Sequence, residues 1–150
     1  MKKYLSVFVS GLLLMALCAC GGGKAKDFSP DSAKDLLSSG AFSETLTDID
    51  LPVACALFGI DESAVTGGAV YGSTGATAET LAILTFSTAD QAEAARKSVG
   101  CWLEDQTESL SDYLPLELPK LKDAVNEVRG ASLFLAVCSD YAPVTEFLSK

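Results

Sequence analysis

Acidic side chains crowd one half of a predicted long helix, where carboxylates could act as a general acid and a general base or could hold a calcium ion. Glu104 and Glu108, and then Glu108 and Asp112, are spaced four residues apart, with Asp105 beside them. This spacing puts Glu104, Glu108 and Asp112 on one helix face. Hydrolysis by two carboxylates needs acids in different environments inside a cleft, which neighbouring surface acids do not provide. The pattern favours a solvated helix face, with weak Ca²⁺ binding as the alternative.

A glycine-rich segment, Gly67 to Thr74, superficially matches the phosphate-binding pattern G-x-x-x-x-G-K-[ST]. Ser73 occupies the lysine position, so the charge that would neutralise phosphate is missing, and the segment leads into a predicted strand rather than a helix. We therefore interpret these glycines as bulge and turn residues.

The chain contains no histidine, which restricts both catalysis and metal binding. A serine nucleophile would lack its usual base, and a zinc site would need thiolates and carboxylates alone. Three cysteines follow the N-terminal segment, Cys55, Cys101 and Cys138, each in an apolar setting and without a C-x-x-C pair. We interpret them as buried small hydrophobic residues, with one disulfide plus one free thiol as the alternative. No catalytic residue, metal or cofactor is predicted.

The N-terminus has the pattern of an export signal. Met1-Lys2-Lys3 carries two positive charges, and no charged residue occurs from Tyr4 to Cys20, where apolar residues predominate. A basic segment followed by a short apolar one is typical of a secretory signal peptide. The stretch is short for a membrane span, which needs roughly 20 apolar residues. Residues 1–19 are predicted to be the signal peptide.

The residues at the predicted cleavage site resemble the lipobox of bacterial lipoproteins. Leu17-Cys18-Ala19-Cys20 puts leucine at position minus three, small Ala19 at minus one and Cys20 at plus one, whereas modification of Cys18 would put bulky Leu17 at minus one. The resemblance implies a diacylglyceryl thioether on Cys20, and two acyl chains anchor a protein more firmly than one. Residues 20–28, rich in glycine after Cys20, are then a lipidated flexible tether on the extracytoplasmic face of the cell membrane.

Composition predicts a single acidic domain. Removing Lys2 and Lys3 with the signal leaves 9 basic and 20 acidic residues, a net charge of −11. Such a surface repels phosphates and anionic headgroups, so nucleic acid is not an expected partner and the membrane is reached through the acyl anchor alone. A chain of this length buries one core, and residues 29–150 are predicted to form one domain.

Two short helices are predicted at the start of the domain. Ser29 and Pro30 are typical of a helix start, and Gly40 suits the end of that helix. A second helix is predicted from about Leu51 to Phe58, between Asp50 and Gly59, with four residues facing the core: Val53, Ala54, Leu57 and Phe58.

Strands and longer helices follow. Residues 64–86 have the pattern of a β-hairpin, and Thr88 with Gln91 forms the capping box of a long helix. Apolar residues of that helix recur every three or four positions: Ala92, Ala95, Val99, Trp102 or Leu103, and Leu110, with Gln106 and Tyr113 in the same series. Two further strands, at 125–128 and 132–138, precede a terminal helix.

This order predicts an α+β fold: a four-stranded antiparallel sheet, with helices mainly on one face, in which two short helices precede a ββαββα order. If nothing in the chain covers the other face, Tyr71, Phe86 and Phe134 would form an interaction patch.

The order and spacing of these motifs resemble the DUF4358 lipoproteins of Gram-positive bacteria related to clostridia. The similarity rests on the lipobox, Leu51-Pro52, Val70-Tyr71-Gly72, the strand ending at Phe86, Asp112-Tyr113-Leu114-Pro115 and Cys138-Ser139-Asp140, and it covers roughly residues 30 to 148. The chain departs from the family at Gly100-Cys101, where relatives tend to be polar or basic. The resemblance implies a small α+β domain in the cell envelope, and it assigns no activity or site residue.

The sequence therefore favours a lipid-anchored binding or accessory module that is not an enzyme and that recognises an envelope protein or a small ligand. A carboxylate-dependent hydrolase of cell-wall polymer, using Glu104, Glu108 and Asp112, is the alternative.

Overall fold

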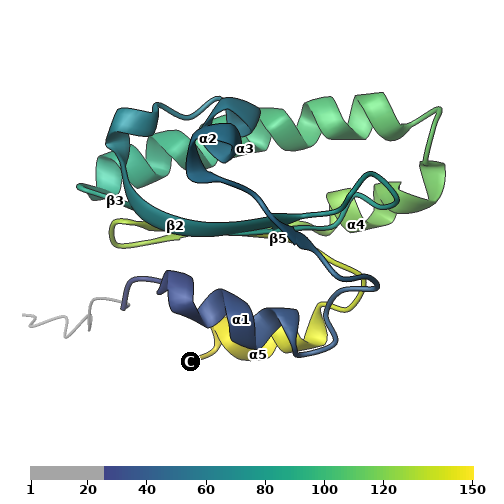
Figure 1. The fold of residues 1–150 in the computed structure, drawn as a ribbon, viewed down its shortest axis with the longest axis horizontal. Coiled ribbons are helices and arrows are strands. Elements are labelled where there is room, and N and C mark those ends of the chain that lie inside the picture. Colours follow the sequence, from purple (N-terminus) through teal and green to yellow (C-terminus); the bar gives the residue numbers. More distant parts are fainter. Residues whose placement is uncertain (1–25) are drawn as a thin grey trace, which may run out of the picture.

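The computed structural model describes residues 26–150 (Figure 1). The predicted signal peptide, Cys20 and most of the predicted tether lie outside the described residues. The elements are η1 (Pro30–Ser32), α1 (Ala33–Leu37), β1 (Thr47–Asp48), α2 (Leu51–Phe58), η2 (Glu62–Ala64), β2 (Val65–Gly72), β3 (Thr80–Phe86), α3 (Ala89–Leu110), η3 (Pro115–Glu117), α4 (Leu118–Lys122), β4 (Val125–Arg129), β5 (Ser132–Val137) and α5 (Ala142–Leu148). The α+β class and the ββαββα order of the larger elements are confirmed.

The sheet has five antiparallel strands in the order β1-β2-β3-β5-β4, so the prediction of four strands was wrong. The additional strand, β1, is two residues long and pairs Thr47 with Gly72 and Asp48 with Tyr71. Two residues are too few to produce a recognisable alternation of apolar and polar side chains. In the central strands β3 and β5 nearly every residue is buried, as expected for strands covered on both faces.

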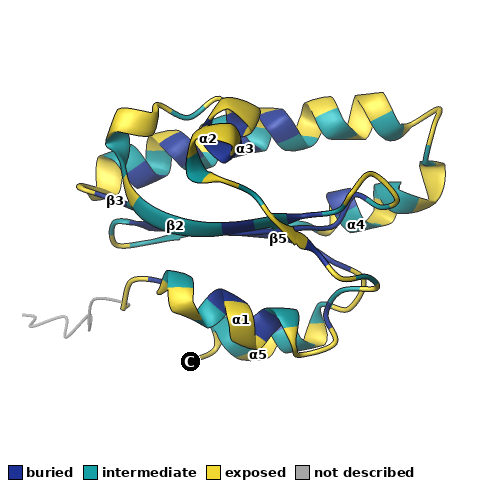
Figure 2. Cartoon of the chain, viewed as in Figure 1, coloured by how far each residue is buried: buried dark blue, intermediate teal, exposed yellow. Residues whose placement is uncertain are grey.

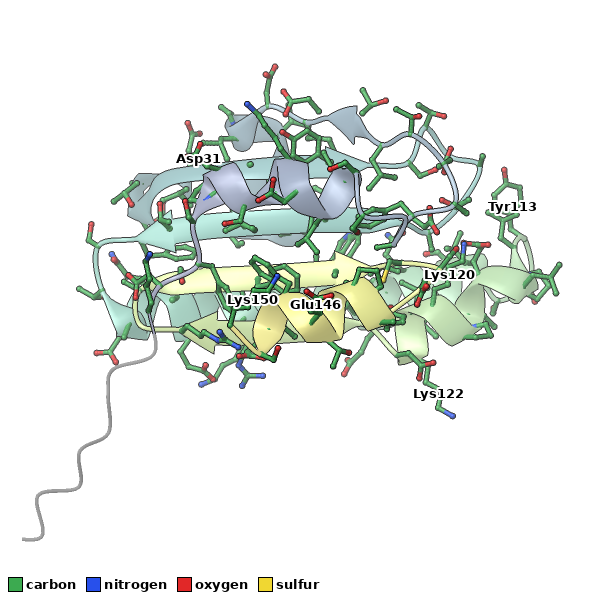
Figure 3. The ribbon with its side chains drawn as sticks, turned by 90° about the horizontal axis from the view of Figure 1, so that it is seen from below. Asp31, Tyr113, Lys120, Lys122, Glu146 and Lys150 are labelled. Carbon is green, nitrogen blue, oxygen red and sulfur yellow. The ribbon has the colours of Figure 1, made fainter. Side chains whose placement is uncertain are left out.

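Helices cover both faces of the sheet, which corrects the prediction that they lie mainly on one. Helices α2, α3 and α4 pack on one face, and α1 and α5 lie side by side across the other (Figures 1 and 3). Alternate residues of β3 enter the two cores: Leu84 faces α2 and α3, whereas Ile83 faces α1 and α5. The short helices at the two ends of the domain thus complete the second core.

This second layer buries most of the predicted interaction patch. Phe134 is fully buried between Phe28 and Phe147, with both pairs of ring centroids 5.3 Å apart. Phe86 is buried in the core below α3, and Tyr71 is partly exposed. Phe86 and Phe134 are therefore core residues and do not form an interaction patch. Phe28, assigned by the sequence to the tether, belongs to the folded domain.

The predicted hairpin glycines have the expected roles. The register of β2 against β3 shifts between Val65 and Gly67, which is a bulge, and Gly75 turns the connecting loop at a φ of 105°. A Cβ on Gly68 would lie 2.6 Å from Leu84 Cδ2, so the close approach of β2 to its neighbours requires glycine.

Helix α3 matches its prediction closely, and α2 matches in part. The Thr88–Gln91 capping box is present, and Ala92, Ala95, Val99 and Trp102 are buried. Helix α2 ends at Gly59, which has a φ of 66°, and it buries Ala54 and Phe58. The prediction that Val53 and Leu57 face the core was wrong, because both are exposed. Figure 2 shows that α2 has both buried and exposed residues.

Every strand and both covering layers lie within residues 28–148. This segment therefore has its own two-sided core, as expected for a domain that folds by itself. Within the described residues, no helix is long and apolar enough to cross a membrane.

Candidate functional site

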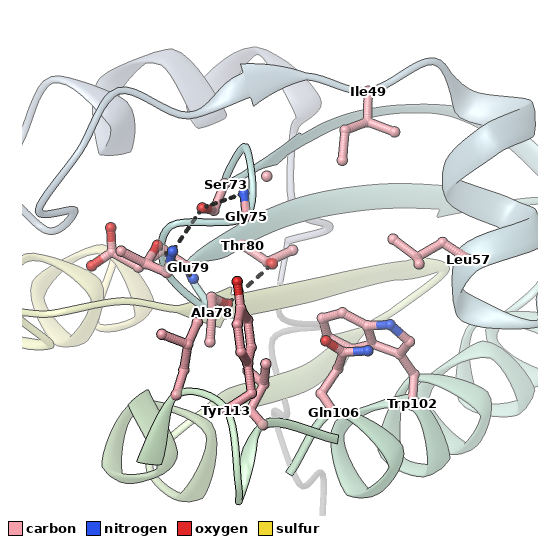
Figure 4. A pocket seen from close by; sticks show the side chains of 14 residues that line it. Ile49, Leu57, Ser73, Gly75, Ala78, Glu79, Thr80, Trp102, Gln106 and Tyr113 are labelled. Carbon is pink, nitrogen blue, oxygen red and sulfur yellow. Dashed lines mark hydrogen bonds between the residues drawn. The ribbon is translucent and has the colours of Figure 1, made fainter. Parts of the chain in front are cut away.

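A groove opens between helix α2, the β2–β3 loop and the C-terminal half of α3 (Figure 4). We call it the α2/α3 groove. Its cavity volume is about 330 Å³, near the lower end of the range for small-ligand sites. The residues used below come from these elements: Leu57 from α2, Ala78, Glu79 and Thr80 from the hairpin, Trp102 and Gln106 from α3, and Tyr113 from the turn after α3.

Trp102 has an unsatisfied hydrogen-bond donor in the wall of this groove. Its side chain is 9% exposed and packs edge-on against Phe58, with ring centroids 5.0 Å apart. Within residues 26–150 its Nε1 has no hydrogen-bond partner. A buried indole N–H usually has a partner, and leaving one unpaired costs about 1–3 kcal/mol. Trp102 thus lines the groove while its N–H is buried and unpaired within the described residues.

Gln106 lies one helical turn after Trp102 and lines the same cavity (Figure 4). It is half-buried, and its side chain makes no hydrogen bond within the described part of the chain. The hydroxyls nearby are occupied: Ser73 Oγ accepts from two backbone amides, and Thr80 Oγ1 donates to the carbonyl of Ala78. Among the described residues, the amide of Gln106 and the hydroxyl of Tyr113 are thus polar groups of the groove with no side-chain hydrogen bond.

Two exposed apolar side chains line the groove. Among the described residues, four large hydrophobic side chains are exposed: Val53 (59%), Leu57 (45%), Tyr113 (70%) and Leu116 (88%). Leu57 and Tyr113 line the cavity, whereas Val53 and Leu116 do not. Exposed apolar side chains in a cavity wall are typical of binding sites.

A buried ion pair fixes the hairpin residues beside the groove. Glu79 is fully buried, and its carboxylate accepts hydrogen bonds from the Ser43 amide (2.9 and 3.1 Å), Ser139 Oγ (2.5 Å) and Lys120 Nζ (3.2 Å). Lys120 also pairs with Glu117 at 2.9 Å, and Glu117 accepts from the Ala78 amide at 3.0 Å. The network ties the hairpin to the loops before β1 and after β5 and to helix α4.

These contacts keep the ion pair charged. Burial would raise the pKa of Glu79, but hydrogen bonds from Ser139, Ser43 and Lys120 outweigh it and hold the pKa below its ordinary value. Burial would lower the pKa of Lys120, but hydrogen bonds to Glu117 and Glu79 raise it overall. The carboxylate is fully engaged, so it offers no free charge to a ligand in the groove.

The acidic face of α3 forms no enclosed carboxylate cleft. Glu104, Glu108 and Asp112 are exposed, and the first two border a shallow hollow with Leu121. They therefore lack the contrast in environment that acid–base hydrolysis requires. Within residues 26–150, no group of three or more histidine, cysteine or acidic residues is arranged to hold a metal ion.

The three cysteines of the domain are free thiols. Cys55 and Cys138 are buried as predicted, and burial raises the pKa of Cys138 to about 11. Cys101 is exposed on α3, so the prediction that it is buried was wrong.

Sequence reasoning recognised neither Trp102 nor Glu79 as site residues. Trp102 was expected in the apolar stripe of α3, where it does pack, but periodicity says nothing about the partner of its N–H. Glu79 could have been noticed as an acid directly before the apolar run of β3.

The fold defines a small α+β domain in which a five-stranded antiparallel sheet separates two helical layers. The chain belongs to the family described as Domain of unknown function (DUF4358), whose match covers residues 39–138. These bounds include the hairpin, α3 and the whole α2/α3 groove. No curated protein matches the chain. No solved structure matches it.

Proposed function

We propose that this protein is a lipid-anchored binding module of the bacterial cell envelope, and that it binds an uncharged, mainly apolar ligand in the α2/α3 groove. The observation that carries the proposal is a cavity of about 330 Å³ in which exposed Leu57 and Tyr113 lie with Trp102 and the side-chain amide of Gln106. An uncharged ligand would cover the exposed apolar side chains and could form a hydrogen bond with the amide of Gln106.

The groove favours an uncharged ligand. Within residues 26–150, Glu79 is the one carboxylate that lines it, and Ser43, Ser139 and Lys120 already engage this carboxylate. A charged group entering the cavity would lose hydration without gaining a free counter-charge.

A matched pair of rim variants tests this function. The chain has a single tryptophan, so the domain of residues 26–150 gives one indole N–H resonance, and that resonance reports on the groove. Benzylacetone, an uncharged apolar ketone, is expected to shift this resonance saturably. Leu57→Glu places a charge in the cavity wall and should weaken binding about ten-fold or more.

Val53→Glu is the control, because it adds the same charge on the same helix but outside the cavity wall. It should leave ketone binding within about two-fold of wild type, since exposed charges interact weakly. Equal effects of the two variants, or no saturable shift in the unmodified domain, would count against the groove as the binding site.

The membrane anchor has its own test in the bacterial host. We expect the intact mass of the membrane-extracted protein to correspond to a chain that begins at Cys20 and carries added acyl mass. Cys20→Ala should abolish both the acylation and the membrane association, because the domain has no other predicted anchor. A wild-type chain of unprocessed mass would refute the anchor.

A further inference from the structure

The described chain enters the domain at one end of the sheet. Asp27 lies against Gly130 in the β4–β5 turn, and the Phe28 amide donates to Ser132 Oγ at the start of β5 (2.7 Å). The guanidinium of Arg129 lies 4.7 Å from the centre of the Phe28 ring. These contacts fix the start of the domain beside the β4–β5 turn. We call this end of the sheet the tether end.

The α2/α3 groove lies at the opposite end of the sheet. Strand β3 begins at Thr80, which lines the groove, and its Thr85 pairs with Ser132 at the tether end. Helix α3 begins near the tether end and reaches the groove at Gln106, about 25 Å along its axis at 1.5 Å per residue. Figure 1 shows the first described residues and the connection from α3 to α4 at opposite ends of the domain.

The predicted tether keeps the tether end close to the membrane. Lys26 is six residues after Cys20, the predicted site of acylation. A glycine-rich chain of this length spans about 13 Å on average and about 20 Å when fully extended. An upright domain therefore holds the groove well clear of the lipid headgroups. The tether alone does not keep the domain upright, so the charge of its surface decides the orientation.

Charge differs between the two halves of α3. The half near the tether end carries two acids, Asp90 and Glu93, and two bases, Arg96 and Lys97. An anionic membrane surface attracts bases and repels acids. The half near the groove, with the turn that follows it, is described in full and carries exposed acids without a base: Glu104, Asp105, Glu108 and Asp112.

Acids balance the bases that lie nearest to the two ends of the domain. Lys122, the exposed base of α4, adjoins Asp123. The acids of α3 thus remain as uncompensated charge beside the groove, and they repel that end of the domain from an anionic bilayer. The ion pairs are Arg129–Glu127 and Lys150–Glu146 near the tether end, and Lys120 with both Glu79 and Glu117 beside the groove.

From this arrangement we propose that the domain stands on the membrane by its tether end, and that its acidic half holds the α2/α3 groove toward the aqueous side. The ligand then reaches the groove from outside the bilayer, and it is not a lipid of the membrane that anchors the protein. This inference rests on the proposed function, because it gives the orientation of the same groove and the source of its ligand.

Quenching of the single tryptophan measures the orientation. The acylated protein from its host is reconstituted into vesicles of phosphatidylglycerol and phosphatidylcholine, in which part of the phosphatidylcholine carries a nitroxide on its headgroup. The nitroxide quenches tryptophans that lie close to the headgroups. Trp102 should keep its emission, whereas Ser29→Trp, which adds an exposed tryptophan at the tether end, should lose emission. Strong quenching of Trp102 would overturn the proposal, and so would equal quenching of the two proteins.

A triple variant, Glu104→Gln with Glu108→Gln and Asp112→Asn, tests the role of charge. None of these residues lines the groove, so benzylacetone binding should stay within about two-fold of wild type. On the anionic vesicles Trp102 should be quenched more strongly than in wild type, because the uncharged helix face allows the domain to tip. On phosphatidylcholine alone the two proteins should be quenched equally. A variant quenched no more than wild type on anionic vesicles would refute charge as the cause of the orientation.

Benzylacetone binding separates this inference from the proposed function. A groove that is open to water throughout predicts that the anchored protein binds benzylacetone within about two-fold of the free domain in the same vesicle suspension. Binding about ten-fold weaker after anchoring would mean that the groove faces the bilayer or holds a lipid. The inference would then fail while the proposed function stands. If neither form binds benzylacetone, both fail.

Discussion

Replacing Phe134 with alanine is expected to lower the free energy of unfolding of the domain by about 4 kcal/mol, within the range for truncating a buried phenylalanine. Phe134 is fully buried and contacts Phe28 and Phe147 across the sheet face that α1 and α5 cover. The substitution would remove the side chain that joins the first and last segments of the domain. Urea unfolding measures the loss, and the slope of the free energy of unfolding against urea concentration should stay unchanged.

Tyr113→Ala serves as the control for Phe134→Ala, since it truncates an aromatic side chain that is 70% exposed. It should change the free energy of unfolding by no more than about 0.5 kcal/mol. A cost below about 1 kcal/mol for Phe134→Ala would mean that α1 and α5 do not cover this face, and it would restore Phe134 to the predicted interaction patch.

Replacing Lys120 with methionine is expected to cost about 3 kcal/mol at about pH 7, because it leaves the buried carboxylate of Glu79 without its counter-charge. The value lies at the low end of the range for a broken buried ion pair, since the Lys120 side chain is still 18% exposed. Methionine keeps the length and most of the packing of the lysine side chain. Urea unfolding again gives the measurement.

Glu79→Gln on the Lys120→Met background tests the cause. The double variant should be more stable than Lys120→Met alone by about 1–2 kcal/mol, because the fully buried carboxylate at position 79 is then replaced by a neutral amide. Glu117 loses its pairing with Lys120 in both variants, so it does not contribute to the difference. A double variant that is less stable would show that the cost comes from lost packing around Lys120 rather than from the ion pair.

The ion pair also predicts how the cost of Lys120→Met varies with pH. The pKa of Glu79 in the folded state is below its ordinary value of 4.5. The stability that the charged carboxylate contributes is therefore complete above pH 4.5 and is lost as the pH falls through the folded pKa. The pKa of Lys120 in the folded state is above its ordinary value of 10.5. The stability that the charged ammonium group contributes is therefore complete below pH 10.5 and is lost as the pH rises through the folded pKa. The cost of Lys120→Met should therefore be largest between these limits and should shrink in acid.

Helices in which the apolar spacing repeats several times, or whose ends carry recognisable capping residues, could be predicted from the sequence. Helix α3 has a capping box and four buried positions in register, and α2 lies between Asp50 and Gly59 as expected. Strand β1 could not be predicted, because its two residues pair with β2 through the backbone alone. The exposure of Val53 and Leu57 was missed because apolar spacing does not reveal which faces of a short helix find a neighbour.

The second helical layer and the site were harder to predict. The core face of α1 and α5 consists of a few residues such as Leu36 and Val144, too few for a strong periodic signal. The ion pair joins Glu79 to Lys120, and the groove brings Leu57 near Trp102 and Tyr113. Contacts between such distant positions depend on tertiary packing, which a single sequence does not encode in local patterns.

The measurement that tests the central claim most directly is the set of nuclear Overhauser contacts made by benzylacetone bound to the domain of residues 26–150. The account predicts contacts from the probe to the Trp102 indole proton and to the Leu57 methyl groups, since both side chains line the cavity. Contacts to α1 or α5 instead, or none to Trp102 when the probe saturates the protein, would contradict binding in the α2/α3 groove.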